Sequence, residues 1–145
     1  MIIVLFGQPH CGKSTLAKKL VEDGAWNIDG DELRNIFKNT DYSRQGRIKN
    51  LNRASDIAVY MNHIGPDNII LSLVYPYKEA RDYLNTISDD VKWVYLTYTG
   101  ERGREKFHVT DFDVPTDGEN VLHIDTSSMT PEESLIIIER YIYSN

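Results

Sequence analysis

The residues best suited to chemistry form a glycine-rich stretch near the start of the chain, residues 7–15. They fit the pattern of a glycine, four residues and then Gly-Lys-Ser. A turn of this kind directs successive backbone N–H groups at one anion, and the positive end of a helix follows it. The pattern predicts a triphosphate site in which Lys13 reaches the β- and γ-phosphates and Ser14 ligates magnesium. The ATP-binding residues expected from this stretch are Gly7, His10, Cys11, Gly12, Lys13, Ser14 and Thr15.

Two carboxylates flank a glycine in Asp29-Gly30-Asp31, where a short predicted strand ends. Phosphoryl transfer depends mainly on positioning and charge neutralisation, and a magnesium site usually includes a carboxylate. The apolar strand predicted over 68–74 ends without an acidic residue, so this help must come from elsewhere. We expect one aspartate to assist the metal through water while the other orients or deprotonates an acceptor hydroxyl. An ordinary acidic turn is the plain alternative. The expected catalytic residues are Lys13, Asp29 and Asp31.

Four basic residues and no acidic one lie between Asp41 and Asp56, namely Arg44, Arg47, Lys49 and Arg53. Two interpretations stay open: a site for phosphates, or the solvated face of a helix. The whole chain has a net charge of −6, which argues against extended, non-specific contact with nucleic acid. A local basic site is compatible with that charge.

The elements that must hold these residues alternate between strands and helices. Apolar runs predict strands over 1–6, 25–28, 68–74, 91–97 and 121–124. Helical spacing predicts helices over 13–23, 32–38, 44–63, 78–87 and 131–143. We expect Asp31 or Gly30 to cap the second helix, Ser43 the third, and Thr130 with Glu133 the last. The order predicts an α/β fold in one domain over 1–145, with a parallel sheet of about five strands between helical layers.

Composition indicates the class of protein and the compartment that it occupies. Of the 145 residues, 41% are hydrophobic, and no apolar run approaches the roughly 20 residues of a membrane span. The one cysteine cannot form an internal disulfide, which favours a reducing compartment and hence the cytoplasm. The region 99–120 has no clear periodicity, and a loop of that length in a compact domain is usually functional.

Asp29-Gly30-Asp31 with Arg34, and then Tyr42-Ser43, resemble motifs of the adenylylsulfate kinases, a family of P-loop kinases. Asp29-Gly30-Asp31 followed by Arg34 is similar to the family's Asp-Gly-Asp with its nearby arginine. After Tyr42-Ser43, the family's next positions are matched by Arg47, Asn50 and Arg53. Its later motifs resemble Ser72-Leu73-Val74-Tyr75-Pro76-Tyr77 with Arg81, Lys106-Phe107-His108, and Asp125-Thr126-Ser127.

This resemblance implies a three-layer P-loop fold and transfer of the γ-phosphate of ATP to the 3′-hydroxyl of adenylylsulfate, as in sulfate assimilation. Asp31 would face that hydroxyl, while Tyr42 and Phe107 would sandwich the acceptor's adenine. The acceptor's phosphosulfate would be held by Arg34, Arg47 and Asn50, with further acceptor contacts from Val74 and Lys106. On the ATP side the resemblance adds Arg102 and Thr126.

The chain departs from the family pattern at three places. Tyr75 stands where the family has a serine, Gly46 stands where it has an aspartate, and the stretch 97–105 is shorter. Two other functions stay open. One is a P-loop kinase that phosphorylates another nucleotide, a modified base or a polynucleotide end, and the other is a nucleotide-binding regulatory module without turnover. The expected partners are ATP and a nucleotide-like small molecule, with no membrane, and a homodimer stays open.

Overall fold

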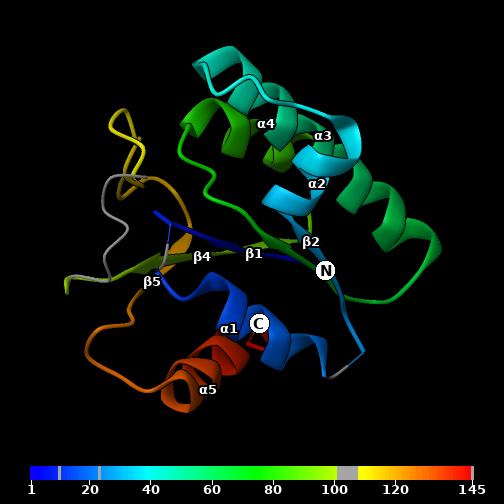
Figure 1. Ribbon diagram of the computed structural model, residues 1–145. Coiled ribbons are helices and arrows are strands. Elements are labelled where there is room, and N and C mark those ends of the chain that lie inside the picture. The colour runs from blue at the N-terminus through cyan, green and yellow to red at the C-terminus, as the bar shows by residue number, and fades with distance from the viewer. Residues whose placement is uncertain (10, 23, 101–107, 145) are drawn as a thin grey trace.

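The computed structural model describes residues 1–9, 11–22, 24–100 and 108–144, which form a three-layer α/β fold (Figure 1). Its parallel sheet has five strands in the order β2-β3-β1-β4-β5. The strands are β1 (Ile2–Phe6), β2 (Trp26–Asp29), β3 (Ile69–Ser72), β4 (Val91–Thr97) and β5 (Val121–Asp125). The helices are α1 (Lys13–Val21), α2 (Gly30–Phe37), α3 (Arg44–Ile64), α4 (Lys78–Ile87) and α5 (Pro131–Ile142). The predicted fold class is confirmed.

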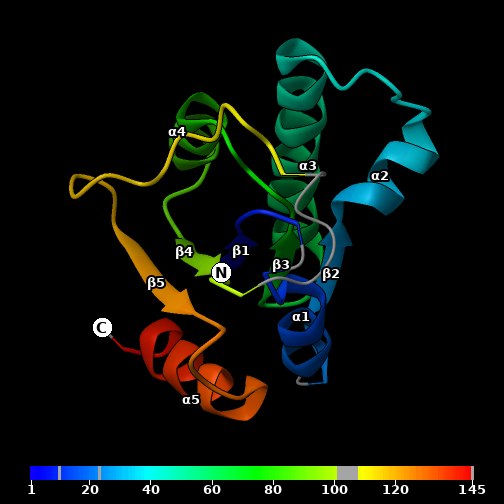
Figure 2. The same cartoon turned by 60° about the vertical axis from the view of Figure 1, so that its left-hand side comes forward.

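The helices cover both faces of the sheet. Helices α2, α3 and α4 lie on one face, and α1 and α5 lie on the other (Figures 1 and 2). Strands β1 and β3 are buried along their whole length, which explains why their sequences are continuous apolar runs rather than alternating ones. The two faces carry separate cores, one against α3 and α4 and one against α1 and α5. This layering brings the carboxyl ends of all five strands to one edge of the sheet.

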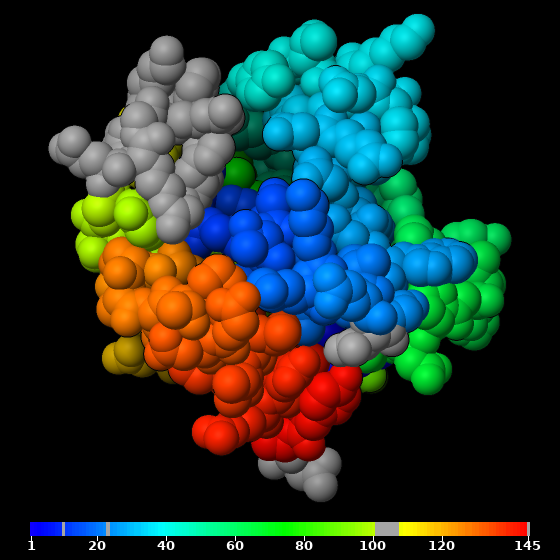
Figure 3. Space-filling view, turned by 60° about the horizontal axis from the view of Figure 1, so that its bottom comes forward, coloured from blue at the N-terminus to red at the C-terminus, as the bar shows by residue number. Residues whose placement is uncertain are grey.

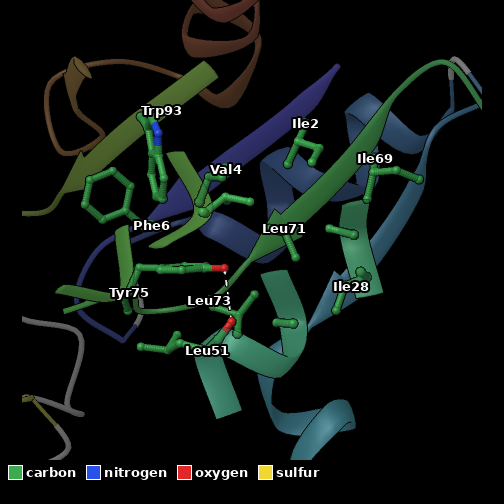
Figure 4. Close-up of a cluster of buried hydrophobic side chains, with 14 of the residues drawn as sticks. Ile2, Val4, Phe6, Ile28, Leu51, Ile69, Leu71, Leu73, Tyr75 and Trp93 are labelled. Atoms are coloured by element: carbon green, nitrogen blue, oxygen red, sulfur yellow. Dashed lines mark hydrogen bonds between the residues drawn. The ribbon is translucent and has the colours of Figure 1, made fainter. Parts of the chain in front are cut away.

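Aromatic rings fill the centre of the core against α3. Phe6 and Tyr75 each meet the Trp93 ring edge-on, with ring centroids 5.5 and 5.4 Å from it. The Tyr75 hydroxyl points at α3, where it donates to the Leu51 carbonyl at 3.5 Å (Figure 4). It also shares a hydrogen bond of 2.7 Å with Ser55 Oγ. Burial raises the pKa of Tyr75 well above its ordinary value. Tyr75 therefore belongs to the core beneath the sheet edge.

Helix caps follow the sequence with one exception. The Ser43 side chain accepts the backbone N–H of Gly46, and Thr130 forms a reciprocal capping box with Glu133, as predicted. The prediction that Asp31 or Gly30 caps α2 is wrong. The cap is Asp29, whose backbone is extended and whose carboxylate accepts the N–H groups of Asp31 and Glu32, so that α2 starts directly after β2.

None of the helices formed by the described residues has the length and apolar character that a membrane crossing requires.

Candidate active site

The phosphate loop, residues 7–15, depends on two glycines with positive φ. Gly7 has φ 147, and a Cβ added there would lie 2.2 Å from the Leu96 carbonyl oxygen. Gly12 has φ 102 and precedes the first residue of α1. A residue with a side chain is disfavoured at both positions by the backbone, and at Gly7 also by the close approach of β4. The motif's glycines thus let the loop turn tightly between β1 and α1.

Lys13 lies folded into the phosphate loop. Its Nζ donates to the carbonyls of Gly7 and Gln8 at 3.0 and 2.9 Å, and lies 3.5 Å from Cys11 Sγ. The Cys11 side chain is buried, so its thiol is not exposed to a ligand in the loop. The ammonium thus lies within the anion-binding turn, close to where a phosphate would sit.

Thr126 supports the loop from the end of β5. Its Oγ1 donates to the carbonyls of Cys11 and Thr97 at 2.8 and 3.0 Å. Its side chain also faces Gly12, where an added Cβ would lie 3.6 Å from it. Thr126 is therefore in contact with the phosphate loop, and its part in binding ATP stays a prediction. Figure 3 looks onto this region, with the phosphate loop and α1 in blue between α2 and α5.

The two aspartates at the end of β2 face the phosphate loop across one cavity. This cavity of about 440 Å³ is lined by Pro9, Gly12, Lys13, Ser14, Thr15, Asp29, Gly30, Asp31, Ser72, Leu73 and Val74. Strand β3 lies between β1 and β2, yet it ends at Ser72 without covering this space. Oδ1 of Asp29 accepts the N–H groups of Asp31 and Glu32 at 2.8 and 3.1 Å. The cap engages that one oxygen of Asp29.

A second cavity of about 570 Å³ adjoins the first. It is lined by Pro9, Gly30, Asp31, Arg34, Tyr42, Arg47, Asn50, Leu51, Leu73, Val74, Pro76, His108 and Val109. All the described residues predicted to bind the acceptor line this cavity, namely Asp31, Arg34, Tyr42, Arg47, Asn50 and Val74. The predicted residues His10, Arg102, Lys106 and Phe107 lie outside the described residues.

A family model described as adenylylsulphate kinase matches residues 1–105. The chain belongs to the adenylylsulphate kinase family. As a member of that family it is an ATP-dependent phosphotransferase, and the predicted kinase class is confirmed. The family match also supports a nucleotide kinase.

Two relatives of this adenylylsulphate kinase family member are also named kinases. The chain is 26% identical over 159 residues to a putative adenylate kinase of Pyrococcus furiosus, covering 92% of this chain and 79% of the relative. It is 27% identical over 146 residues to the cytidine diphosphoramidate kinase of Campylobacter jejuni, covering 94% and 84%. The solved APS kinase of Mycobacterium tuberculosis in complex with AMPPNP and APS matches with a TM-score of 0.78 at 22% identity, over 99% of this chain and 97% of that one. At that identity the match supports the fold.

The side chains that could bind a metal in this family member suit magnesium, which takes some of its ligands from phosphates and water. They suit less well a metal whose ligands all come from the protein. Among the described residues, no group of three or more His, Cys, Asp or Glu side chains converges on one point. Magnesium usually binds through one or two carboxylates together with substrate phosphates and waters. Ser14, Asp29 and Asp31 line the same cavity as the phosphate loop and supply such a partial set.

The basic cluster of α3 divides between the cavity and the outer surface. Arg47 lines the second cavity, called the acceptor cavity from here on after the predicted acceptor residues that line it. Arg44 instead stacks 4.1 Å from the Tyr77 ring centroid and lies 3.8 Å from both Glu79 and Asp111. Arg53 stacks 4.1 Å from the Phe37 ring centroid, and it lines a shallow surface depression together with Lys49. Lys49 and Arg53 therefore fit the interpretation that the basic residues form a solvated helix face. Of the four, Arg47 is the one that fits a site for phosphates.

Arg34 organises the loop that follows α2 as well as lining the acceptor cavity. Its Nη1 donates to the Asn39 carbonyl at 3.2 Å, to Asn39 Oδ1 at 3.3 Å and to the Asp41 carbonyl at 3.2 Å. Its guanidinium also lies 4.3 Å from the Tyr42 ring centroid. One face of Tyr42 is therefore occupied by Arg34, and an acceptor base would have to stack on the other face.

The departure at Gly46 has a steric cause that the sequence did not reveal. A Cβ at Gly46 would lie 2.3 Å from the Asp41 carbonyl oxygen, because the loop packs directly on the first turn of α3. Hydrogen bonds from Ser43 lower the pKa of Asp41 in the same turn. An aspartate side chain therefore has no room at position 46 of this chain.

Proposed function

We propose that this kinase transfers the γ-phosphate of ATP to the 3′-hydroxyl of adenylylsulfate and forms 3′-phosphoadenylylsulfate. The observation that carries the proposal is the position of Asp31, which lines both the phosphate-loop cavity and the acceptor cavity. A carboxylate at that junction can accept the hydroxyl proton while the hydroxyl oxygen bonds to the γ-phosphorus. The bond between the γ-phosphorus and the oxygen of ADP then breaks, and ADP leaves.

On the donor side, the backbone of the phosphate loop and Lys13 bind the phosphates, and Thr126 supports the loop. Ser14 with Asp29 or Asp31 would hold magnesium, which neutralises phosphate charge when it is bound. On the acceptor side, Arg47 lines the cavity, and Asn50 is buried there with its Oδ1 lacking a partner among the described residues. These two side chains are the proposed anchors for the acceptor's anionic group and its neighbouring polar atoms.

A kinase with another nucleotide acceptor is the second candidate. It is favoured by the relatives, whose names include an adenylate kinase and a cytidine diphosphoramidate kinase. The departures at Gly46 and Tyr75 also lie next to or beneath the acceptor cavity and set this chain apart from the family pattern. A nucleotide-binding module without turnover is less well supported, because the chain retains Lys13, Ser14, Asp29 and Asp31 around one cavity.

The decisive experiment is an acceptor screen with radiolabelled ATP and magnesium. We expect label to enter adenylylsulfate at the 3′-hydroxyl in preference to AMP, cytidine diphosphoramidate and a 5′-hydroxyl oligonucleotide. Label in one of the other acceptors alone would replace the proposed substrate and keep the kinase. Absence of label in every acceptor, with ATP binding intact, would favour the regulatory module.

A matched pair of lysine variants controls the screen. Lys13→Ala should abolish transfer, because it removes the cation inside the phosphate loop. Lys18→Ala changes an exposed lysine of the same helix and should leave transfer unchanged. The proposal includes a single domain over residues 1–145 and a cytoplasmic location, which domain-boundary proteolysis and fractionation would test. Sedimentation would decide the homodimer that the sequence leaves open.

A further inference from the structure

Gln8, the second residue of the phosphate loop, ties that loop to a wall of the acceptor cavity. Its Nε2 donates to the Val109 carbonyl at 2.8 Å, and its Oε1 accepts the Val109 backbone N–H at 2.8 Å. One side-chain amide thus pairs with both backbone groups of a residue 101 positions away. Two bonds fix both the position and the direction of the amide, as a neighbouring strand would.

Val109 is itself part of the acceptor cavity. Its side chain is 7% exposed, and it lines the cavity beside His108. Gly7 makes a second link to this cavity through its backbone. Its N–H donates to the carbonyl of Val74 at 3.1 Å, and Val74 lines the same cavity. The first two residues of the phosphate loop therefore hold two parts of the acceptor wall that are distant in sequence.

Lys13 contacts the same two loop residues from the ATP side. Its ammonium donates to the carbonyls of Gly7 and Gln8. An ATP phosphate in the loop competes for that ammonium, because charged acceptors form stronger hydrogen bonds than carbonyls do. A phosphate that draws the ammonium away would therefore change the hydrogen bonding of the Gly7 and Gln8 carbonyls, and Gln8 is the residue whose side chain pairs with Val109.

We infer that Gln8 is a positioning residue that couples occupancy of the ATP site to the wall of the acceptor cavity. The inference rests on ATP binding at the phosphate loop and is independent of which acceptor the kinase uses. Ordering the wall before the acceptor arrives lowers the cost of acceptor binding. By reciprocity, the acceptor strengthens ATP binding by the same factor.

The test follows the Val109 amide by ¹H–¹⁵N NMR while magnesium and AMPPNP are titrated into the intact chain. In the wild type the Val109 signal shifts saturably with AMPPNP. In Gln8→Leu, AMPPNP still binds but the Val109 response is lost. Gln45→Leu changes the other glutamine of the chain, which is exposed on α3, and keeps the wild-type response. Gln8→Asn retains the amide but is too short to reach Val109, so it repeats the loss if the leucine variant fails to fold.

A second measurement gives the size of the coupling. With adenylylsulfate as the probe, AMPPNP should tighten binding by about fivefold or more in the wild type and leave it unchanged in Gln8→Asn. If adenylylsulfate does not bind at all, the proposed acceptor is wrong, while the NMR titration still tests Gln8. A wild-type Val109 signal that ignores AMPPNP, or a Gln8→Asn signal that responds like the wild type, overturns the inference.

Discussion

Oδ1 of Asp29 accepts the backbone N–H of Asp31 at 2.8 Å. The two acidic residues at the end of β2 therefore lie at different positions of the helix start. Asp29 is the N-cap of α2, and its carboxylate is oriented by that helix. Asp31 lies one residue inside the helix and lines both cavities. The cap therefore fixes the backbone that carries the proposed base, and the two carboxylates should respond differently to substitution.

Asp31→Asn should remove proton acceptance while keeping the shape of the side chain. General-base catalysis contributes about 10²–10⁴-fold, so kcat should fall by that order while ATP binding and Tm stay unchanged. Steady-state kinetics with ATP and the best acceptor of the screen would measure the loss. Glu32→Gln, on an exposed neighbour in the same helical turn, is the matched control. Wild-type turnover in Asp31→Asn would remove this residue from the chemistry.

Asp29 should respond according to its capping role. Asp29→Ala removes the cap of α2 and should lower the free energy of unfolding by about 1 kcal/mol, whereas Asp29→Asn keeps a capping oxygen and should cost much less. If Asp29 also assists magnesium, both variants should need more magnesium for half-maximal activity. Denaturant unfolding and a magnesium titration separate the two effects. Equal stability of the alanine and asparagine variants would contradict the capping role.

Sequence patterns predicted those features that depend on local residue order. The buried runs of β1 and β3, the Ser43 cap and the Thr130 capping box each follow from a few neighbouring residues. The phosphate loop belongs to this class as well, because its glycines are needed by the backbone of the loop itself. The convergence of the predicted acceptor residues on one cavity followed from the parallel sheet together with the family resemblance.

Features that depend on packing between distant segments could not be predicted from sequence patterns. Arg44 and Arg47 have the same charge three positions apart on α3, yet Arg44 lies beside Glu79 and Asp111 while Arg47 lines the cavity. The pairing of Gln8 with Val109 spans 101 positions and leaves no periodic signal. The α2 cap was missed because both boundaries were displaced: β2 ends one residue later than predicted, at Asp29, and α2 begins two residues earlier, at Gly30.

Arg81 should matter for stability rather than for substrate binding. Its side chain is 1% exposed, pairs with Glu119 at 3.0 Å, and donates to the carbonyls of Tyr75 and Asp113 at 2.9 and 2.8 Å. Arg81→Met leaves the Glu119 carboxylate, only 13% exposed, without its partner, and should cost about 3–5 kcal/mol of unfolding free energy.

The double variant Arg81→Met with Glu119→Gln should recover part of that loss, because the unpaired charge is gone. Lys78→Met breaks an exposed i,i+4 pair with Asp82, and should change stability far less than Arg81→Met does. Chemical denaturation of the four proteins measures these differences. A loss in Arg81→Met as small as that in Lys78→Met would contradict a buried ion pair.

Tyr75 should make the fold sensitive to alkali. Burial raises the pKa of its hydroxyl in the folded chain above the ordinary value of 10.0, so between these two values the unfolded chain loses a proton that the folded chain retains. Stability attributable to this group is intact below pH 10 and falls as the pH rises further, by about 1.4 kcal/mol per pH unit for one proton.

Tyr75→Phe should cost about 1 kcal/mol at pH 7 through the lost hydrogen bond to Ser55, and should reduce the alkaline slope by that one proton. Tyr60→Phe, on a side chain that is 64% exposed, should alter neither quantity. Urea unfolding at several pH values from 7 to 11 compares the three proteins, and equal slopes above pH 10 in Tyr75→Phe and the wild type would contradict the assignment of the alkaline loss to Tyr75.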